Sequence, residues 1–188
     1  VTADFITPPV DDPYRWSIRS LLVDTLFTVL RKDFANNRKI ALEVESLIDD
    51  PQQHKEYQWL VAAGFTRSGE YAKAFEMYLK LAGLIDGGPQ QLPLATTIAE
   101  VNPDWTTREQ RRVAGQLSGL LSLTADADAN EKETINQLVQ AQWERAIHSE
   151  NEKAIRQFLL FFDAHPLADR ARLALAMNLV RDKPSVEA

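Results

Sequence analysis

The stretch QWLVAAGFTRSGEYAKAFEMYLKLA, residues 58–82, decides the fold of this chain. On both sides of Ser68-Gly69-Glu70 its apolar residues recur at intervals of three and four, which is the spacing of one buried face on each of two helices. Gly69 suits a turn because glycine adopts left-handed backbone conformations at little cost. Ala74 is small, as a close approach of two helices requires. The stretch therefore predicts two antiparallel helices joined by a tight turn.

This pattern resembles the tetratricopeptide repeat, a helix–turn–helix unit of about 34 residues. The repeat has packed small or apolar residues in its first helix, glycine at the turn, and a small residue followed by an aromatic one in its second helix. Those positions are filled here by Val61, Ala62, Phe65, Gly69, Ala74 and Tyr78, with Tyr71 directly after the turn. The sequence departs from the repeat at Gln58, where the family prefers an aromatic residue, and at Asp86, where it prefers proline.

A weaker resemblance covers residues 138–180. Phe158 and Pro166 stand at the spacing of a second repeat helix and its terminating proline, and Trp143 falls on a packed position of the helix before it. Leu167–Val180 would then begin a further unit. The resemblance implies a right-handed solenoid of stacked antiparallel helix pairs, whose concave side holds a peptide or a protein.

Helical spacing continues over most of the remaining chain, and no segment shows the alternation of strands with hairpin turns. We therefore expect an all-α domain of about eight helices over residues 14–182, with an irregular insert at 86–104. An extended leader (1–13) precedes it and a tail (183–188) follows. The signals that start or stop helices are Asn36 or Asn37 at the start of the second, Asp49-Asp50-Pro51 at its end, Gly87-Gly88-Pro89 at the end of the fourth, and Thr106 or Thr107 at the start of the fifth.

Composition excludes several classes of function. The 188 residues include 21 Lys and Arg against 27 Asp and Glu, a formal net charge of −6, whereas general nucleic-acid binding needs a basic surface. The chain has no cysteine, which excludes disulfides, thiol nucleophiles and cysteine-ligated metals. The apolar stretch Leu21–Leu30 is too short for a transmembrane segment. A cysteine-free chain suits the cytoplasm and a cell-envelope or periplasmic compartment equally.

No catalytic or cofactor motif occurs in the sequence. His54, His148 and His165 lack the paired spacing of a zinc-binding helix, so structural roles are favoured for all three. The acidic segment that begins at residue 126 starts like a calcium loop, but Glu131 stands where that loop needs glycine and Gln137 where it needs glutamate. The sequence therefore predicts no enzyme, no cofactor and no metal site.

Trp59 is the most informative residue outside the apolar faces, because it lies about 200° around its helix from Tyr57. In the repeat frame this is the concave, ligand-binding side; the alternative is that Trp59 packs on the preceding helix pair. The candidate partner-binding residues on that side are Glu56, Trp59 and Arg67. A basic patch, either a partner or anion contact or a solvated face of the fifth helix, consists of Arg108, Arg111 and Arg112.

The last expected helix, from Leu167 to about Arg181, has apolar residues on two faces. Leu173, Met177 and Val180 form the second face, roughly opposite the one that packs on the preceding helix. Stacked repeats normally end in a helix with a polar outer face. We therefore expect Leu173 and Met177 to support weak self-association, to receive a segment of a longer chain, or to be covered by the leader.

The function expected from the sequence is that of a non-catalytic helical-repeat scaffold for protein–protein or peptide interaction, as a fragment of a larger multidomain protein. Residues 158–176 also resemble the helical segment that accompanies quinoprotein-type β-propellers in large bacterial envelope proteins. One alternative is a small all-α ligand-binding or enzymatic domain with its site at the 90–103 insert. Another is a purely structural spacer. An open concave groove would favour the scaffold, whereas a deep pocket with convergent polar groups would favour the enzyme.

Overall fold

The computed structural model describes residues 13–84, 103–124, 128–149 and 151–181. These residues form eight helices and no strand, so the all-α prediction is confirmed. The helices are α1 (Pro13–Lys32), α2 (Arg38–Glu45), α3 (Pro51–Arg67), α4 (Tyr71–Leu81), α6 (Pro103–Leu123), α7 (Ala129–His148), α8 (Glu152–Phe162) and α9 (Leu167–Arg181). The expected tail and most of the expected leader and insert lie outside the described residues.

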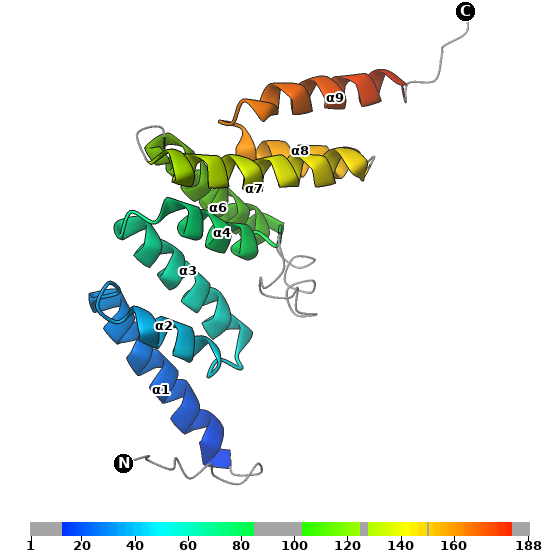
Figure 1. The fold of residues 1–188 in the computed structure, drawn as a ribbon. Coiled ribbons are helices and arrows are strands. Elements are labelled where there is room, and N and C mark those ends of the chain that lie inside the picture. Colours follow the sequence, from blue (N-terminus) through cyan, green and yellow to red (C-terminus); the bar gives the residue numbers. More distant parts are fainter. Residues whose placement is uncertain (1–12, 85–102, 125–127, 150, 182–188) are drawn as a thin grey trace, which may run out of the picture.

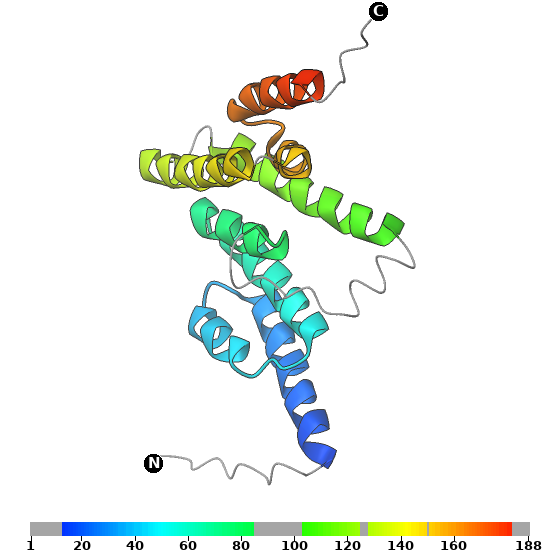
Figure 2. The ribbon, with the colours of Figure 1, turned by 90° about the vertical axis from the view of Figure 1, so that its right-hand side faces the viewer.

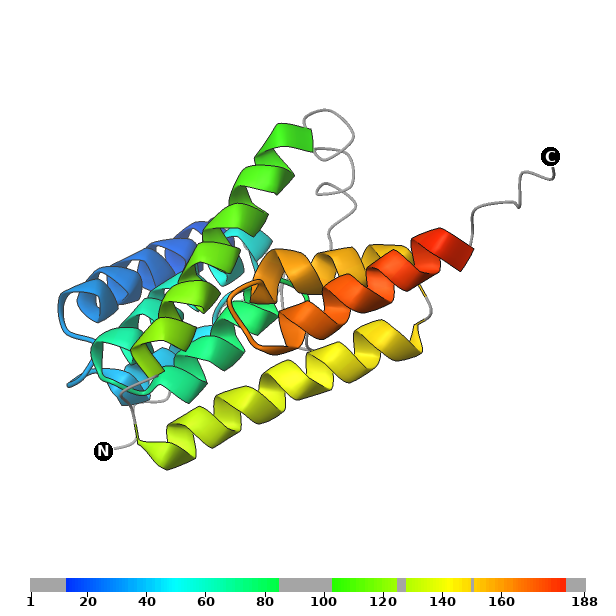
Figure 3. The same cartoon turned by 90° about the horizontal axis from the view of Figure 1, so that it is seen from above.

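The helices follow one another along an elongated molecule, with α1 at one end and α9 at the other (Figure 1). Figure 2 shows the same order from a second side. α3 and α4 form a hairpin, and α7, α8 and α9 lie side by side with alternating direction, while α6 crosses the stack obliquely (Figures 1 and 3). α1 packs on α2 and α3, and α9 packs on α7 and α8. Each end helix therefore keeps one face open, as far as the described residues reach.

Two adjoining hydrophobic clusters hold the helices together. One joins α1, α2 and α3 and includes the fully buried rings of Phe27 and Tyr57. The other runs from α3 to α9 and includes Phe75 and Phe162. The side chain of Phe65 packs against both clusters. The apolar faces recognised from helical spacing thus form one continuous core along the molecule.

Both helices of the α3–α4 hairpin end in the same backbone arrangement. After α3, the N–H of Gly69 donates to the carbonyl of Thr66, and the N–H of Glu70 donates to that of Phe65. The same two bonds recur after α4 around Gly83. This is the Schellman arrangement, which requires a residue in the left-handed region. The φ angles of Gly69 and Gly83 are 76° and 68°, which explains why glycine stands at both positions.

The predicted end of the fourth helix is therefore wrong. The apolar spacing continues through Ala82 and Ile85, and Gly87-Gly88-Pro89 looks like its stop. In the structure α4 ends at Leu81, because Gly83 already closes the helix. The predicted stop itself lies outside the described residues.

Two further predicted boundaries are wrong. α2 ends at Glu45, before the predicted stop at Asp49-Asp50-Pro51. Instead the carboxylate of Asp50 accepts a hydrogen bond from the N–H of Gln53 at 3.1 Å and caps the start of α3, with Pro51 in its first turn. α6 begins at Pro103, so Thr106 and Thr107 lie inside the helix rather than at its start. Proline suits the first helical position because its missing N–H would have no partner there.

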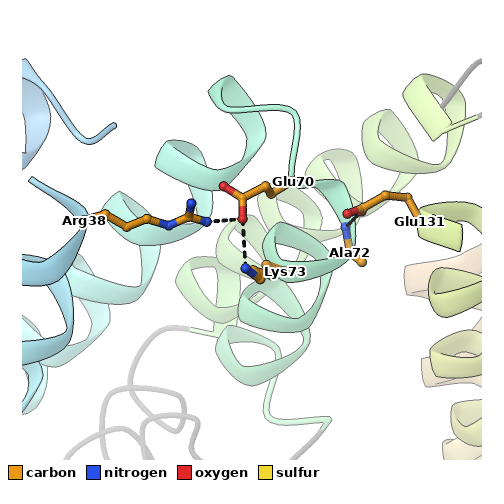
Figure 4. A network of polar contacts seen from close by, with 5 residues as sticks. All are labelled: Arg38, Glu70, Ala72, Lys73 and Glu131. Carbon is orange, nitrogen blue, oxygen red and sulfur yellow. Dashed lines mark hydrogen bonds and ion pairs between the residues drawn. The ribbon is translucent and has the colours of Figure 1, made fainter. Parts of the chain in front are cut away.

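Polar contacts hold the α3–α4 hairpin between α2 and α7 (Figure 4). Glu70 accepts hydrogen bonds from Arg38 of α2 and from Lys73 of α4. Burial alone would raise the pKa of Glu70, but these hydrogen bonds outweigh it and lower the pKa. On the other side, the carboxylate of Glu131 in α7 accepts a hydrogen bond from the N–H of Ala72. That N–H belongs to the first turn of α4, where no intrahelical acceptor exists.

We expect Ala74→Leu to lower the free energy of unfolding by about 1–3 kcal/mol, because Ala74 is fully buried in the core and extra methylenes would overpack it. Chemical denaturation measures the change. Ala176→Leu, at an exposed position of α9, is the matched control and should leave the stability nearly unchanged. Parent-like stability of the Ala74 variant would show that the packing around it is looser than described.

Candidate binding groove between α1, α3, α4 and α6

A hollow of about 340 Å³ opens to solvent between α1, α3, α4 and α6. We call it the Trp59 groove; it is lined by Arg31, Glu56, Trp59, Leu60, Ala63, Arg67, Tyr78, Arg112 and Gln116. The stripe from Glu56 to Arg67 comes from α3 alone. From one helical turn to the next its members are three or four residues apart, and they therefore share one face of that helix.

The indole of Trp59 lies between an arginine and a tyrosine. The Cζ atom of Arg112 is 4.2 Å from the ring centroid, a position in which the negative face of the indole attracts a cation. The ring of Tyr78 meets the indole edge-on, with centroids 5.4 Å apart and planes inclined at 68°. Trp59 is half-buried and lines the groove. Its aromatic contact is with α4, the following helix, rather than with the preceding helix pair.

Positive charge predominates in the groove. Glu56 pairs with Arg31 of α1. Arg67 and Arg112 make no hydrogen bond or ion pair with the described part of the chain; Arg112 contacts the indole, and its charge acts on Tyr78. Two guanidinium groups therefore keep their N–H donors available, as far as the described residues reach, in a chain whose formal net charge is −6.

Tyr78 adds a polar group to the apolar wall. Its hydroxyl donates a hydrogen bond to Oε1 of Gln116 on α6 at 3.2 Å. Burial raises the pKa of Tyr78, although a hydrogen bond with Thr66 and the charge of Arg112 act in the opposite direction. The hydroxyl thus stays protonated at neutral pH and remains a hydrogen-bond donor.

Four of the eight candidate residues meet in this one groove. The spacing of Glu56, Trp59 and Arg67 predicts one face of a helix, and α3 does present them together. Arg112 was part of the basic patch, and it is the member of that patch that reaches the groove.

The other candidates lie elsewhere. Arg108 and Arg111 are exposed on α6 and do not line the groove. Leu173 and Met177 are exposed on α9, at the far end of the molecule (Figure 1). The second apolar face expected for the last helix is therefore open to the extent that the structure describes its surroundings.

Five of the nine lining residues are not among the candidates from the sequence: Arg31, Leu60, Ala63, Tyr78 and Gln116. Tyr78 occupies the aromatic position of the tetratricopeptide-like pattern, from which only a role in packing is predicted. Arg31 and Gln116 lie on α1 and α6, which no local pattern connects with α3. No signal in the sequence could have brought these helices together, since helical spacing says nothing about which helices are neighbours.

A second hollow, of about 500 Å³, lies between α7 and the start of α9. Its lining includes the polar side chains of Glu133, Asn136, Glu144 and His165, but most of the surface that it exposes is apolar. Among its described lining residues there is no Trp, Tyr or Phe. Nowhere in the described ranges do three His, Cys, Asp or Glu side chains come close enough together to hold a metal ion. This hollow therefore has weaker means of holding a ligand than the Trp59 groove.

The histidines contact residues close to them in sequence, and Nε2 of His165 also lies 3.4 Å from Oδ1 of Asn136 on α7. His54 lies 3.1 Å from the side-chain nitrogen of Gln58, which is fully buried. Nδ1 of His148 lies 2.7 Å from the carbonyl of Glu144 near the end of α7. Nδ1 of His165 accepts a hydrogen bond from the N–H of Leu167 at the start of α9. These contacts agree with the structural roles expected for them.

We expect the protein to lose stability as the pH falls from neutral to about 5, in part through His165. Burial lowers the pKa of His165 below its ordinary value of about 6.5. The unfolded chain therefore binds the proton first, so the contribution of His165 is complete above about pH 6.5 and is lost below it. His165→Asn keeps an acceptor for the N–H of Leu167 but does not titrate. Denaturation at both pH values should show a smaller pH effect in this variant than in the parent; an equal effect would exclude His165 as a source.

We expect acrylamide to quench the fluorescence of Trp59 readily, because its indole is half-buried at the wall of an open groove. The measurement uses a variant in which Trp16, Trp105 and Trp143 are replaced by phenylalanine. Adding Arg112→Ala should raise the quenching constant further, since the guanidinium then no longer covers the ring. If acrylamide does not quench Trp59, its indole is inaccessible and Trp59 has only a packing role.

Comparisons with protein-family models, with curated proteins and with solved structures found no match for this chain. A separate finding concerns membranes: none of the helices in the described ranges combines the length and the apolar character needed to cross a bilayer. Any statement about function therefore depends on the geometry of the Trp59 groove.

Proposed function

We propose that the protein is a non-catalytic helical-repeat scaffold, built as a right-handed tetratricopeptide-like solenoid, that binds an extended segment of a partner protein in the Trp59 groove. The observation that carries this proposal is the position of Arg112 over the indole of Trp59, in the same groove as Arg67. Tryptophan and arginine at the centre of a surface hollow are the residue types that dominate binding energy at protein interfaces.

The groove favours a ligand that is partly apolar and partly acidic. Trp59, Leu60 and Ala63 offer an apolar strip along α3. Arg67 and Arg112 border that strip with guanidinium donors, which bind carboxylates in a two-pronged geometry. A peptide segment with an Asp or Glu next to an apolar side chain meets both requirements. The ion pair of Arg31 with Glu56 lies at the rim of the groove. It would disfavour peptides whose charges do not complement those of the groove.

The rival proposals find less support. The groove is open, and its described lining has no paired nucleophile and base. The 90–103 insert, at which the enzymatic alternative places its site, lies outside the described residues. A purely structural spacer does not require the hollow that Trp59, Arg67 and Arg112 line together.

The test is selection of peptides that bind the immobilised protein from a displayed random library. We expect enrichment of sequences that combine acidic and apolar residues. Trp59→Ala and Arg67→Ala should each weaken binding of a selected peptide at least tenfold, which corresponds to about 1.4 kcal/mol. Arg170→Ala, which removes an exposed arginine from α9, is the matched control and should bind like the parent.

Two outcomes would contradict the proposal. One is a selection that enriches no sequence over the background. The other is a set of peptides whose affinity does not change in the Trp59 and Arg67 variants, since these would bind elsewhere on the molecule. Circular dichroism of each variant verifies that it remains folded.

A further inference from the structure

Both end helices of the molecule expose an apolar stripe. On α9, the exposed fractions of Leu173, Met177 and Val180 are 63%, 64% and 74%. On α1, those of Ile18 and Leu21 are 64% and 68%. Exposed apolar patches of this kind on a folded protein usually mark an interaction surface.

The two stripes cannot cover each other within one molecule. α1 and α9 lie at opposite ends of the helix stack (Figure 1), and the faces that pack inward are already occupied by α2 and α3 at one end and by α7 and α8 at the other. An interior helix of this stack has neighbours on both sides. Among the described helices, each end helix thus has the environment of an interior helix with one neighbour missing.

We propose that a second copy of the chain supplies that neighbour, so that the open face of α1 in one copy packs on the open face of α9 in the next. This head-to-tail association does not use the Trp59 groove, to which α1 contributes only Arg31, a residue outside the exposed stripe. Antiparallel packing continues the alternation of direction already present in α7, α8 and α9 (Figures 1 and 3).

In one antiparallel register, two pairs of apolar residues and one pair of opposite charges come to the same level, while Ile18 lies past the end of α9 at Arg181 and Met177 lies at the level of Asp24. With Leu21 placed opposite Val180, the same register brings Val29 close to the level of Leu173, because both helices advance about 1.5 Å per residue. It also places Lys32 at the level of Asp169. Lys32 is exposed and has no ion pair within the described ranges. The side chain of Asp169 is 86% exposed, and its Oδ1 already pairs with Arg172 of the same helix, which leaves Oδ2 for Lys32 as far as the described residues reach. The α1–α9 pairing therefore combines apolar contact with opposite charges at one end.

The association is expected to be weak and open-ended. A single pair of helices buries less surface than a stable dimer interface needs. Because the two surfaces differ, each added copy leaves a new α1 face and a new α9 face open, and growth stops only if a ring closes. Sedimentation velocity should show a weight-average sedimentation coefficient that rises continuously with protein concentration.

The test uses two blocked variants. Ile18→Glu with Leu21→Glu blocks the α1 face, and Leu173→Glu with Met177→Glu blocks the α9 face. Each double variant alone should sediment as a monomer at every concentration. An equimolar mixture should form a species of twice the monomer mass and nothing larger, because one open α1 face and one open α9 face remain. Leu123→Glu, at an exposed leucine of α6, is the matched control and should associate like the parent.

Other results would overturn the proposal. Dimerisation of the α1-blocked variant by itself would mean that α9 pairs with α9. A parent chain that stays monomeric at all concentrations would exclude association. A monomeric parent that associates only after removal of residues 1–12 would show that this segment is the occupant instead. The register has its own test: Lys32→Asp should weaken the mixed dimer, and Asp169→Lys in the other copy should restore it.

Discussion

Phe162→Ala is expected to lower the free energy of unfolding by about 3–5 kcal/mol, the largest effect among the substitutions considered. The ring of Phe162 is fully buried at the end of α8, with its centroid 4.9 Å from that of Phe158 and 6.3 Å from that of Phe75 on α4. Its removal leaves a cavity where two distant parts of the chain meet. For a domain whose total stability is about 5–15 kcal/mol, the loss is a large fraction.

Leu160→Ala is the control for this prediction, because Leu160 lies on the same helix and is 41% exposed. It removes much less buried surface from the same helix, so we expect it to cost less than about 1 kcal/mol. Guanidinium denaturation followed by circular dichroism gives both values. Equal midpoints for the two variants would mean that the contact between α4 and α8 contributes little to stability.

The spacing of apolar residues was enough to predict most of the fold. The apolar residues of the eight described helices recur at three and four positions, so the existence and order of these helices could be predicted, although several of their ends could not. The hairpin around Gly69 was the most specific part, because a glycine between two apolar faces of helical spacing is typical of a left-handed helix end. Trp143, assigned to a packed position, does pack on Phe158 with centroids 5.4 Å apart.

The errors came from residues whose role depends on the backbone. Gly83 looked like an ordinary member of a helix because Ala82 and Ile85 continue the apolar face, yet its left-handed conformation ends α4. Asp50 and Pro51 were assigned to the end of one helix although they begin the next. An Asp-Pro pair can follow the end of one helix or begin the next, and the spacing of apolar residues does not distinguish the two cases.

The candidate site could be predicted from the sequence only in part. Glu56, Trp59 and Arg67 share a face of α3, and a face of one helix can be derived from residue numbers. The contact of Arg112 with Trp59 joins two helices separated by the whole 86–104 region. Such contacts depend on how helices pack, which the local sequence does not determine.

Gly64→Ala is expected to destabilise the protein by about 2–3 kcal/mol, although alanine normally favours a helix over glycine by about 1 kcal/mol. Gly64 lies inside α3, where the ring of Phe34 packs directly against its backbone. A Cβ atom there would lie 2.4 Å from Cγ of Phe34 and 2.5 Å from Cδ2. Both atoms lie where the ring is attached to Cβ. The ring is nearly buried and is held edge-on against Phe65. The ring cannot move aside without opening the contact between α3 and the α1–α2 turn.

Two comparisons isolate this steric cause. Gly115→Ala on α6 meets no atom within 4 Å, so it should stabilise the protein by about 0.5–1 kcal/mol through helix propensity alone. Phe34→Leu removes the ring, so Gly64→Ala should cost less in that background than in the parent, which gives a coupling energy of at least about 1 kcal/mol in a double-mutant cycle. If Gly64→Ala and Gly115→Ala shift the unfolding midpoint in the same direction, the close approach of Phe34 to α3 is wrong. If the two substitutions at positions 34 and 64 are additive, Phe34 is not the group that restricts position 64.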